Sequence, residues 1–428
     1  MARVSYKWAR GSLSQSGWAL VLAGSLALSG CVGSEALSPP RKVSRAQPAP
    51  VEPSYAAGVA PPAIAMQTPA PGPLAGSTTI GTGPVKVALI LPMSAPGQGG
   101  VVAQSMRNAA QMAVSEFQGQ DITLLVKDDN GTPEGALSVA QQALAEGAEL
   151  IIGPVFSGSV QAAAQVARER GKPIIGFSSD ASVATRGVYL LSFLVQEEVD
   201  RIVAFAAAQG RRSIAALIPE TQYGRVAEAR LQQAAARQGL RIAALEYYPV
   251  GQPQVGVQRL ARVIGGAAPQ VDALFIPDNG DGLPAVAQAL QMAGFDPTRV
   301  KPLGTGVWNE PRIFALPALQ GGWFAAPDNR GFEAFAERYR VRFNTDPIRL
   351  ATLSYDAVTL AAALARMQGA QAFSDAMLTN PAGFAGADGV FRFNPDGTNA
   401  RALTVQEIRN GTAVAVSGAP RTLVASGT

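Results

Sequence analysis

Residues 127–179 read KDDNGTPEGALSVAQQALAEGAELIIGPVFSGSVQAAAQVARERGKPIIGFSS, a stretch in which helical and strand patterns alternate. Its short apolar runs at 150–152 and 173–177 are typical of buried strands, and each follows a segment with apolar residues at helical spacing. Thr132 followed by Pro133 is the pattern of an N-cap and the first position of a helix. Short strands that alternate with helices predict a parallel sheet with helices on both faces.

The same alternation extends to both sides of this stretch. Upstream, VKVALILPM from Val85 has the apolar content of a buried strand, and apolar side chains at helical spacing follow between Val102 and Phe117. ITLLV from Ile122 predicts the next strand. Downstream of Phe193 the cycle starts again, with strands predicted from Ser213, Arg241, Ala273 and Lys301 and helices at 197–209, 224–237, 255–264 and 283–292. Two such sets predict an α/β protein with two Rossmann-like lobes, each built on a parallel sheet.

The last quarter of the chain departs from strict alternation. Residues 321–327, GGWFAAP, predict a strand that crosses between lobes, and helical patterns follow at 332–343 and 351–367. Near the C-terminus, alternating residues flank Asn410-Gly411, which is a strong signal for a two-residue hairpin turn.

The composition of the 428 residues excludes several classes of function. The chain has no His and one Cys, which excludes Ser-His-Asp and Cys-His catalysis, intrachain disulfides and most zinc sites. Gly97, Gly99 and Gly100 do not form the G-x-G-x-x-G pattern of a dinucleotide site, and no paired acids or nucleophile with a base stand out. The formal net charge is +4, and three of the cations lie in the predicted signal peptide, so the mature chain is nearly neutral. This low charge argues against nucleic-acid binding. We expect a protein that is not an enzyme and that carries no metal or cofactor.

Residues 1–30 have the pattern of a secretory signal peptide. Three cations precede an apolar run from Trp18 to Leu28, which is too short to span a hydrocarbon core of about 30 Å as a helix. The run leads to Leu-Ser-Gly-Cys31, which resembles the lipobox of bacterial lipoproteins, where the signal is cut before a Cys that is then lipidated. In Gram-negative lipoproteins an Asp after this Cys usually signals inner-membrane retention, so Val32 implies a lipid anchor on the periplasmic face of the outer membrane. The alternative for Cys31 is an incidental or buried thiol.

Residues 31–84 are predicted to be a lipidated Cys followed by a disordered tether. The segment from Val32 to Pro84 contains eleven prolines and few large apolar residues, so it cannot bury enough surface to offset the entropy of ordering. Its length corresponds to about 40 Å as a random coil and to about 160 Å if fully extended as polyproline. A tail with no mechanical role is the alternative.

Three phrases resemble the type I periplasmic binding proteins, in particular their leucine/isoleucine/valine-binding group. They are KVALILPMSAPG from Lys86, residues 127–179, and IPETQYGRVAEARL from Ile218, and the resemblance covers essentially Val85 to the C-terminus. The branch called penicillin-binding protein activators, outer-membrane lipoproteins that stimulate peptidoglycan synthases, has the same domain.

The resemblance implies a periplasmic-binding domain over residues 85–428 in which the chain crosses between the lobes three times. Lobe 1 is then expected at about 85–196 and 326–392, and lobe 2 at about 197–325 and 393–428. A ligand is expected between the lobes, at the carboxyl ends of the parallel strands.

The loop at 153–159, GPVFSGS, lies between a predicted strand end and a helix start, where backbone N–H groups can approach an anion. The resemblance implies that Ser157 binds the carboxylate of an amino-acid ligand, and Ser159 is a candidate in the same loop. The alternative is that Ser157 or Ser159 caps its own helix. Ser94, in the opening phrase, is a further ligand-binding candidate.

Residues 178–182, SSDAS, follow the next predicted strand, where the family presents a carbonyl and a hydroxyl group to its ligand. The resemblance makes Ser179 and Ser182 candidates for these contacts, and Asp180 is then available to pair with an ammonium group. Turn formation on a solvated loop is the alternative for all of them.

In lobe 2, Tyr223 belongs to a Tyr-Gly pair that matches the family at the mouth of this lobe. Asp278 begins the stretch DNGD after another strand and is a candidate partner for an ammonium group, with a simple turn as its alternative. Leucine-type binders place a Glu in the loop that corresponds to residues 304–308, whereas this chain has none there and Glu310 is displaced. A buried ammonium without a counter-charge costs several kcal/mol, which abolishes useful binding of an amino acid unless another carboxylate substitutes for that Glu. Trp308 is a candidate for an apolar wall of the site, with core packing as its alternative.

These expectations favour a non-catalytic solute-binding lipoprotein. It is expected to clamp a small amino-acid-like or amide ligand between its lobes for ABC-type transport or sensing, with an inner-membrane permease as partner. The alternative is an outer-membrane penicillin-binding protein activator whose lobes bind a peptidoglycan synthase.

Overall fold

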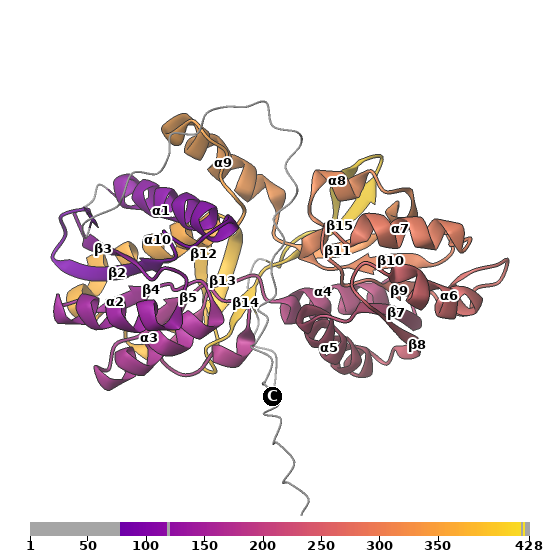
Figure 1. The fold of residues 1–428 in the computed structure, drawn as a ribbon, viewed down its shortest axis with the longest axis horizontal. Coiled ribbons are helices and arrows are strands. Elements are labelled where there is room, and N and C mark those ends of the chain that lie inside the picture. Colours follow the sequence, from indigo (N-terminus) through magenta and orange to yellow (C-terminus); the bar gives the residue numbers. More distant parts are fainter. Residues whose placement is uncertain (1–77, 118–119, 421–422, 424–428) are drawn as a thin grey trace, which may run out of the picture. The chain divides into compact units, whose positions relative to one another are not determined.

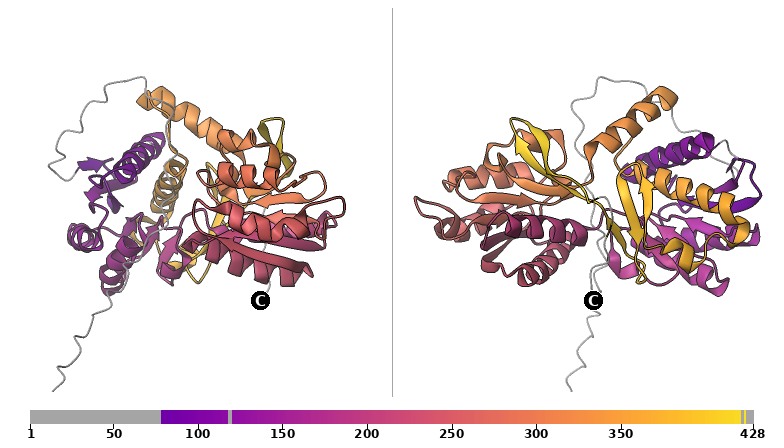
Figure 2. Two further views of the ribbon diagram at one scale, coloured as in Figure 1. Left: turned by 45° about the vertical axis from the view of Figure 1, so that its right-hand side comes forward. Right: turned by 180° about the vertical axis from the view of Figure 1, so that it is seen from behind.

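The computed structural model describes residues 78–117, 120–420 and 423. It contains two separate large sheets, each with helices on both faces, which confirms the predicted α/β fold class with two lobes (Figure 1, Figure 2). The predicted signal peptide, Cys31 and the tether up to residue 77 lie outside the described residues. Within the described ranges, no helix is long and apolar enough to cross a membrane.

Lobe 1 is built on a six-stranded sheet in the order β1-β3-β2-β4-β5-β6. All neighbouring strands are parallel except β1, which is antiparallel to β3. Helices α1 and α10 pack on one face, and α2 and α3 pack on the other. The strands are β1 (Thr78–Ile80), β2 (Val85–Leu91), β3 (Ile122–Asp128), β4 (Leu150–Ile152), β5 (Ile174–Gly176) and β6 (Val188–Leu190). The helices are α1 (Gln98–Glu116), α2 (Pro133–Ala145), α3 (Ser157–Glu169), η1 (Ala181–Val183), α9 (Asn329–Phe343), α10 (Ala351–Gln368), η4 (Gly369–Gln371) and α11 (Asp375–Leu378).

Lobe 2 is built on a seven-stranded sheet in the order β16-β15-β11-β10-β9-β7-β8. Helices α4 and α5 pack on one face of this sheet, and α6, α7 and α8 pack on the other. The strands are β7 (Ser213–Pro219), β8 (Arg241–Tyr248), β9 (Ala273–Phe275), β10 (Lys301–Gly304), β11 (Trp323–Ala326), β15 (Thr404–Arg409) and β16 (Thr412–Ser417). The helices are α4 (Val195–Ala208), α5 (Gln222–Gln238), α6 (Pro253–Ile264), α7 (Leu283–Met292), η2 (Gly306–Trp308), α8 (Pro311–Phe314) and η3 (Pro317–Leu319).

The chain passes between the two large sheets three times, at residues 191–194, 327–328 and 402–403. The first two crossings lie close to the positions expected from the sequence. The third lies further along the chain than the expected boundary after Arg392. A small antiparallel sheet accounts for this shift, because β13 (Gly389–Phe393) pairs with both β12 (Phe384–Gly386) and β14 (Asn399–Arg401) and packs on the core of lobe 1.

Two local predictions can be checked directly against the backbone. The hairpin at Asn410-Gly411 is confirmed, since it joins β15 to β16 and both residues have positive φ, 52° and 76°, as a type I′ turn requires. The expected tether reached residue 84, but β1 lies within it. Its pairing with β3 covers what would otherwise be an open sheet edge.

Each lobe has a helix that begins with the same Thr-x-x-Gly arrangement. The side chain of Thr132 accepts a hydrogen bond from the backbone N–H of Gly135 at 3.0 Å, and Thr221 does the same for Gly224 at 2.9 Å. A Cβ atom at Gly224 would lie 2.2 Å from the carbonyl oxygen of Pro219, so only glycine fits there. The Tyr-Gly pair of lobe 2 therefore has a packing reason for its glycine.

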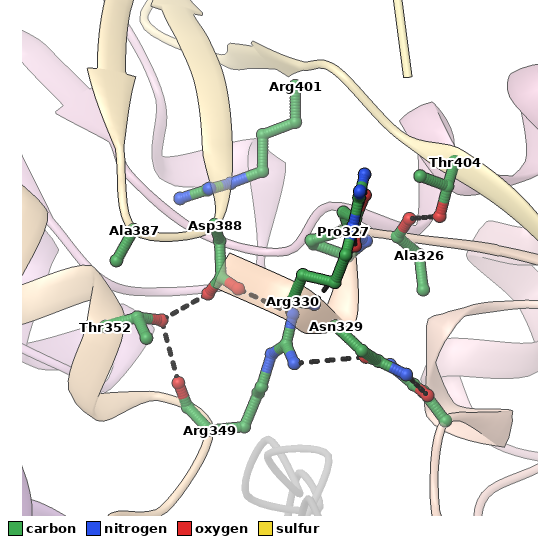
Figure 3. Close-up of polar contacts among 12 residues, drawn as sticks. Ala326, Pro327, Asn329, Arg330, Arg349, Thr352, Ala387, Asp388, Arg401 and Thr404 are labelled. Carbon is green, nitrogen blue, oxygen red and sulfur yellow. Dashed lines mark hydrogen bonds and ion pairs between the residues drawn. The ribbon is translucent and has the colours of Figure 1, made fainter. Parts of the chain in front are cut away.

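The three crossings are joined by hydrogen bonds. The carbonyl oxygen of Ser192, in the first crossing, accepts from Asn399 Nδ2 at 3.0 Å and from Arg401 Nε at 3.4 Å, both beside the third. Thr404 Oγ1 donates to the carbonyl oxygen of Ala326 at 2.8 Å, which joins the second crossing to the third (Figure 3). Burying these polar groups at one place fixes which segments meet there.

Arg401 is buried beside two carboxyl groups, those of Asp356 and Asp388. Arg349 Nη2 donates to Asp388 at 2.6 Å, and the hydroxyl of Thr352 donates to the same carboxylate (Figure 3). Neither terminal nitrogen of Arg401 has a hydrogen-bond partner among the described residues, and neither does Asp356 Oδ2. Burial raises the pKa of Asp356 to about 7, although the nearby Arg401 cation opposes the rise. In this cluster of Arg349, Asp356, Asp388 and Arg401, hydrogen bonds therefore satisfy only some of the buried charged groups.

This cluster predicts a pH dependence of stability. The folded chain keeps the Asp356 proton to a higher pH than the unfolded chain, so the free energy of unfolding should fall as pH rises from about 4 to about 7. Asp356→Asn removes the contribution of this carboxyl group to the pH dependence. In urea unfolding, the free energy of unfolding of the variant should therefore rise relative to that of the original chain as pH increases from 5 to 8. Asp346→Asn, at an exposed position, is the control. An unchanged pH profile in Asp356→Asn would contradict the assignment.

Candidate ligand-binding site

A cavity of about 490 Å³ lies on lobe 1, where β2, β4, β5 and β6 end. Its position follows from the topology, because the carboxyl ends of parallel strands meet at one edge of a sheet and the following loops project from that edge. Its size is in the range of small-molecule sites. It is lined by Pro92, Gln98, Gly99, Val102, Val155, Phe156, Ser157, Phe177, Ser178, Ser179, Asp180, Ser192, Phe193 and Leu350.

The loop between β4 and α3 reaches the cavity because its first residue is glycine. Gly153 has a φ of +91°, and a Cβ there would lie 2.1 Å from the carbonyl oxygen of Ile90 in β2. This close approach places Val155, Phe156 and Ser157 beside the end of β2. Phe156 is the N-cap residue of α3, and its side chain supplies no acceptor for the helix N–H groups.

Three phenylalanines, Phe156, Phe177 and Phe193, make much of the lining apolar. The ring of Phe193 also contacts the cluster that joins the crossings. The guanidinium carbon of Arg401 lies 5.0 Å from the ring centroid, and that of Arg349 lies 5.9 Å from it. Such cation–π contacts are typically worth about 0.5–2 kcal/mol, the larger value applying to desolvated pairs. Phe193 thus belongs both to the cavity and to the junction between the lobes.

The polar part of the lining is a turn held by its own hydrogen bonds. Ser178 Oγ accepts from the backbone N–H of Asp180 at 3.1 Å, and Asp180 Oδ1 accepts from the N–H of Ser182 at 3.0 Å. Ser192 Oγ donates to the carbonyl oxygen of Phe177 at 3.2 Å. Asp180 is the one ionisable residue among those that line the cavity.

Three of the serine and aspartate residues singled out from the sequence line this cavity: Ser157, Ser179 and Asp180. Ser157 is the first residue of α3, and Phe156 holds the N-cap position, so the alternative in which Ser157 or Ser159 is the N-cap is wrong.

Three other candidates in lobe 1 lie outside the lining. Ser159 is fully buried beside Asp129. Burial raises the pKa of Asp129 to about 6, and the nearby Ser159 hydroxyl partly offsets the rise. Ser182, two residues after Asp180, is exposed. The hydroxyl group of Ser94 donates to the side-chain oxygen of Asn130 in the neighbouring loop.

In lobe 2 the candidates lie at the carboxyl ends of its strands and do not line the cavity of lobe 1. The hydroxyl groups of Tyr223 and Thr305 are hydrogen-bonded at 2.7 Å. Asp278 is buried and accepts from Tyr248 Oη at 2.5 Å and from the N–H of Asn279 at 2.7 Å. Burial raises the pKa of Asp278, although these hydrogen bonds oppose the rise.

Trp308 belongs to the core of lobe 2 and forms no wall of this cavity. Its side chain is completely buried, and its Nε1 donates to the carbonyl oxygen of Ile276 at 3.1 Å. The ring is packed so closely that a Cβ at Gly304 would lie 2.1 Å from it. The expectation of a ligand wall is thus corrected to the core-packing alternative.

The loop that lacks the expected Glu is contacted by a carboxyl group from another element. Glu198 of α4 is buried, and its carboxyl group accepts from the N–H of Gly306 at 2.8 Å. Burial raises its pKa to about 8, although the hydrogen bond from Gly306 opposes the rise. No local pattern singles out Glu198, because its contact with Gly306 joins residues that are 108 positions apart.

Sequence reasoning also missed the aromatic and amide lining, in particular Gln98, Phe156, Phe177 and Phe193. A usable signal was present, since Phe177 is the last residue of the predicted apolar run at 173–177 and Phe193 lies shortly after the apolar residues 188–191. In the described part of the chain, no group of three or more His, Cys, Asp or Glu residues could hold a metal ion.

Comparison with known proteins identifies the fold family. A family model described as periplasmic binding protein matches residues 84–413. The chain belongs to the periplasmic binding protein family. Its two lobes and three crossings are those of the type I fold. Among curated proteins, none matches the chain.

Solved structures of this family have the same fold at low sequence identity. A putative branched-chain amino acid ABC transporter protein from Rhodospirillum rubrum is 17% identical, with a TM-score of 0.68 over 78% of this chain and 99% of that one. A leucine binding protein from Thermotoga maritima is 19% identical, with a TM-score of 0.56 over 78% and 98%. A solute binding protein of an ABC transporter from Rhodopseudomonas palustris, in complex with 3,4-dihydroxybenzoic acid, is 20% identical, with a TM-score of 0.57 over 78% and 96%. These likenesses concern the fold.

The placement of Trp308 gives a stability prediction. Trp308→Ala should lower the free energy of unfolding by about 3–5 kcal/mol, because it removes a completely buried aromatic side chain and leaves a cavity. Chemical denaturation measures the change. Met292→Ala, at a side chain that is 84% exposed, should change it by less than about 0.5 kcal/mol. A cost equally small for Trp308→Ala would place the indole outside the core.

Proposed function

We propose that the protein is a non-catalytic solute-binding lipoprotein that clamps a small amino-acid-like or amide ligand between its lobes. The observation that carries this proposal is the cavity of lobe 1, which lies at the strand ends where ligands bind in open α/β sheets. Membership of the periplasmic binding protein family supports it, and so do the structural relatives that are solute-binding proteins of ABC transporters. An inner-membrane permease is the partner that this function requires.

In this proposal the ligand first contacts lobe 1 and the lobes then close around it. Ser157 and Ser179 supply polar contacts in the cavity, and the phenylalanines pack against the apolar part of the ligand. Tyr223 and Asp278, at the strand ends of lobe 2, are proposed to meet the ligand on closure. Closure is stabilised by contacts that exist only in the closed state, and the three crossings serve as its hinge.

Binding without catalysis fits the chemistry of the lining. Acid–base or nucleophilic catalysis needs at least two groups that share a proton or activate one another. The cavity offers a single ionisable side chain, Asp180, and its other polar groups are serines and one glutamine. We therefore propose that the protein is not an enzyme.

We propose that Cys31 carries a lipid anchor on the periplasmic face of the outer membrane, with the following residues as tether. Several acyl chains, at about 0.8 kcal/mol per buried methylene, hold a protein firmly on a bilayer. In a fractionated Gram-negative host, the original chain should be in the outer-membrane fraction and Cys31→Ala in the soluble periplasm. Equal amounts of both proteins in the soluble fraction would contradict lipidation.

A second candidate function is that of a penicillin-binding protein activator. One observation favours it: the loop at 304–308 has no acidic residue, and the nearby carboxyl group of Glu198 is buried against Gly306. The counter-charge that leucine-type binders place in this loop is therefore missing from it. In this alternative the lobes bind a peptidoglycan synthase.

Blocking the cavity tests the first function against the second. In a thermal-shift screen of amino acids, amides and peptidoglycan fragments, a ligand at a hundred times its dissociation constant adds about 2.7 kcal/mol of stability. Ser179→Trp should abolish that shift because the indole fills the cavity, whereas Ser182→Trp, at an exposed position outside the lining, should retain it. No shift with any compound, together with capture of a purified peptidoglycan synthase, would favour the activator.

A further inference from the structure

Two asparagine side chains form hydrogen bonds across the second crossing, which the chain makes at residues 327–328. Asn309 follows η2 in lobe 2, and Asn329 is the first residue of α9, which packs on lobe 1. Asn309 Nδ2 donates to Asn329 Oδ1 at 2.7 Å, and Asn329 Nδ2 donates to Asn309 Oδ1 at 3.1 Å. This reciprocal amide pair joins the two lobes directly beside the crossing.

Asn329 uses its remaining hydrogen-bonding capacity on both lobes as well. Its Oδ1 also accepts from Arg349 Nη1 at 3.4 Å, in lobe 1 (Figure 3). Its Nδ2 also donates to Gln406 Oε1 at 3.3 Å, in lobe 2. A primary amide has two N–H donors and an oxygen with two lone pairs, so these four hydrogen bonds use all of its capacity. Partners from both lobes therefore fix the position of this side chain.

The outer partners of Asn329 are themselves anchored, each within its own part of the fold. Gln406 is buried in β15, and its Nε2 donates to the carbonyl oxygen of Pro327 at 3.2 Å. Arg349 Nη2 donates to the buried carboxylate of Asp388 at 2.6 Å. Because these ends belong to different lobes, a rotation about the second crossing has to lengthen or break the hydrogen bonds between Asn329 and lobe 2.

We propose that the amide pair of Asn309 and Asn329 is a latch that holds the two lobes at one angle when no ligand is bound. Hydrogen bonds between neutral amides give a small net free energy, because water replaces the lost partner when they open. The latch therefore biases the angle between the lobes and still allows other contacts to overcome it. This inference goes beyond the proposed function, since it concerns the protein alone and no particular ligand.

The latch has a consequence for the proposed clamp. A ligand that favours another angle between the lobes has to open the amide pair, and its apparent affinity is lowered by that cost. A ligand that favours the present angle meets lobes that are already in position. The pair of Asn309 and Asn329 thus sets an energetic reference for closure without contacting the ligand.

Pulsed electron paramagnetic resonance without added ligand tests the latch in the full chain. Spin labels at Gln161 in lobe 1 and Met292 in lobe 2, in a Cys31→Ala background, report the distances between the lobes. Asn309→Ala removes both hydrogen bonds of the pair at a half-buried position, so packing changes little. The ratio of distances outside the main peak to distances inside it should rise about tenfold, which corresponds to about 1.4 kcal/mol.

Further variants distinguish the latch from a general loosening of the structure. Asn329→Ala keeps Asp328 as the N-cap of α9 and should raise the ratio at least as much as Asn309→Ala. Combining the two substitutions should raise it by no more than about twofold over Asn329→Ala, because the pair is already broken. Gln232→Ala is the matched control, since it removes an amide whose hydrogen bond to Glu228, at 2.9 Å, stays within α5. Its distribution should equal that of the original chain.

The outcomes separate the latch from the proposed function. Distance distributions of Asn309→Ala and Asn329→Ala that match that of the original chain would overturn the latch, and so would full additivity of the two substitutions. An unchanged circular dichroism spectrum shows that a variant is folded, and Asn309→Ala alone carries the test if Asn329→Ala does not fold. Since the experiment contains no ligand, failure of the latch leaves solute binding standing, and failure to bind any solute leaves the latch standing.

Discussion

The carbonyl oxygen of Ser192 accepts hydrogen bonds from Asn399 and Arg401, and this ties the first chain crossing to the third. Both lobes are discontinuous in sequence, because β12, β13 and β14 return to lobe 1 and β15 and β16 return to lobe 2. The next residue, Phe193, lines the cavity and has the guanidinium of Arg401 5.0 Å from its ring centroid. A ligand that contacts Phe193 therefore touches a residue of the junction. In the proposed function, this contact would link ligand binding to the hinge motion.

The cavity results from local sequence features and topology acting together. Parallel strands bring their carboxyl ends to one edge, and small residues such as Gly153 allow the loops there to approach the neighbouring strand. Three phenylalanines then supply apolar area, and the self-bonded turn at 178–182 supplies one fixed carboxylate. The site thus combines a large apolar surface with one charge, an arrangement in which apolar area gives affinity and the charge gives selectivity.

Much of the fold was predictable from the sequence, because local patterns determine it. Alternating strands and helices indicated the two lobes, and Asn410-Gly411 indicated the final hairpin. The third crossing was placed too early, because the pairing of β13 with β14 depends on contacts that no local pattern reports. For the site, residues next to strand ends such as Ser157 and Asp180 were found. Arg401 and Glu198 depend on tertiary contacts between distant segments and were not. For Trp308, core packing was only the alternative to a ligand wall.

The central claim is that the two lobes form a clamp that responds to a ligand in the cavity of lobe 1. Pulsed electron paramagnetic resonance between spin labels at Gln161 in lobe 1 and Met292 in lobe 2, in a Cys31→Ala background, measures the inter-lobe distance directly. A saturating ligand should shift the distance distribution and narrow it, and the shift should be absent in Ser179→Trp. An identical distribution with and without bound ligand would show that the lobes do not close, and the clamp would have to be abandoned.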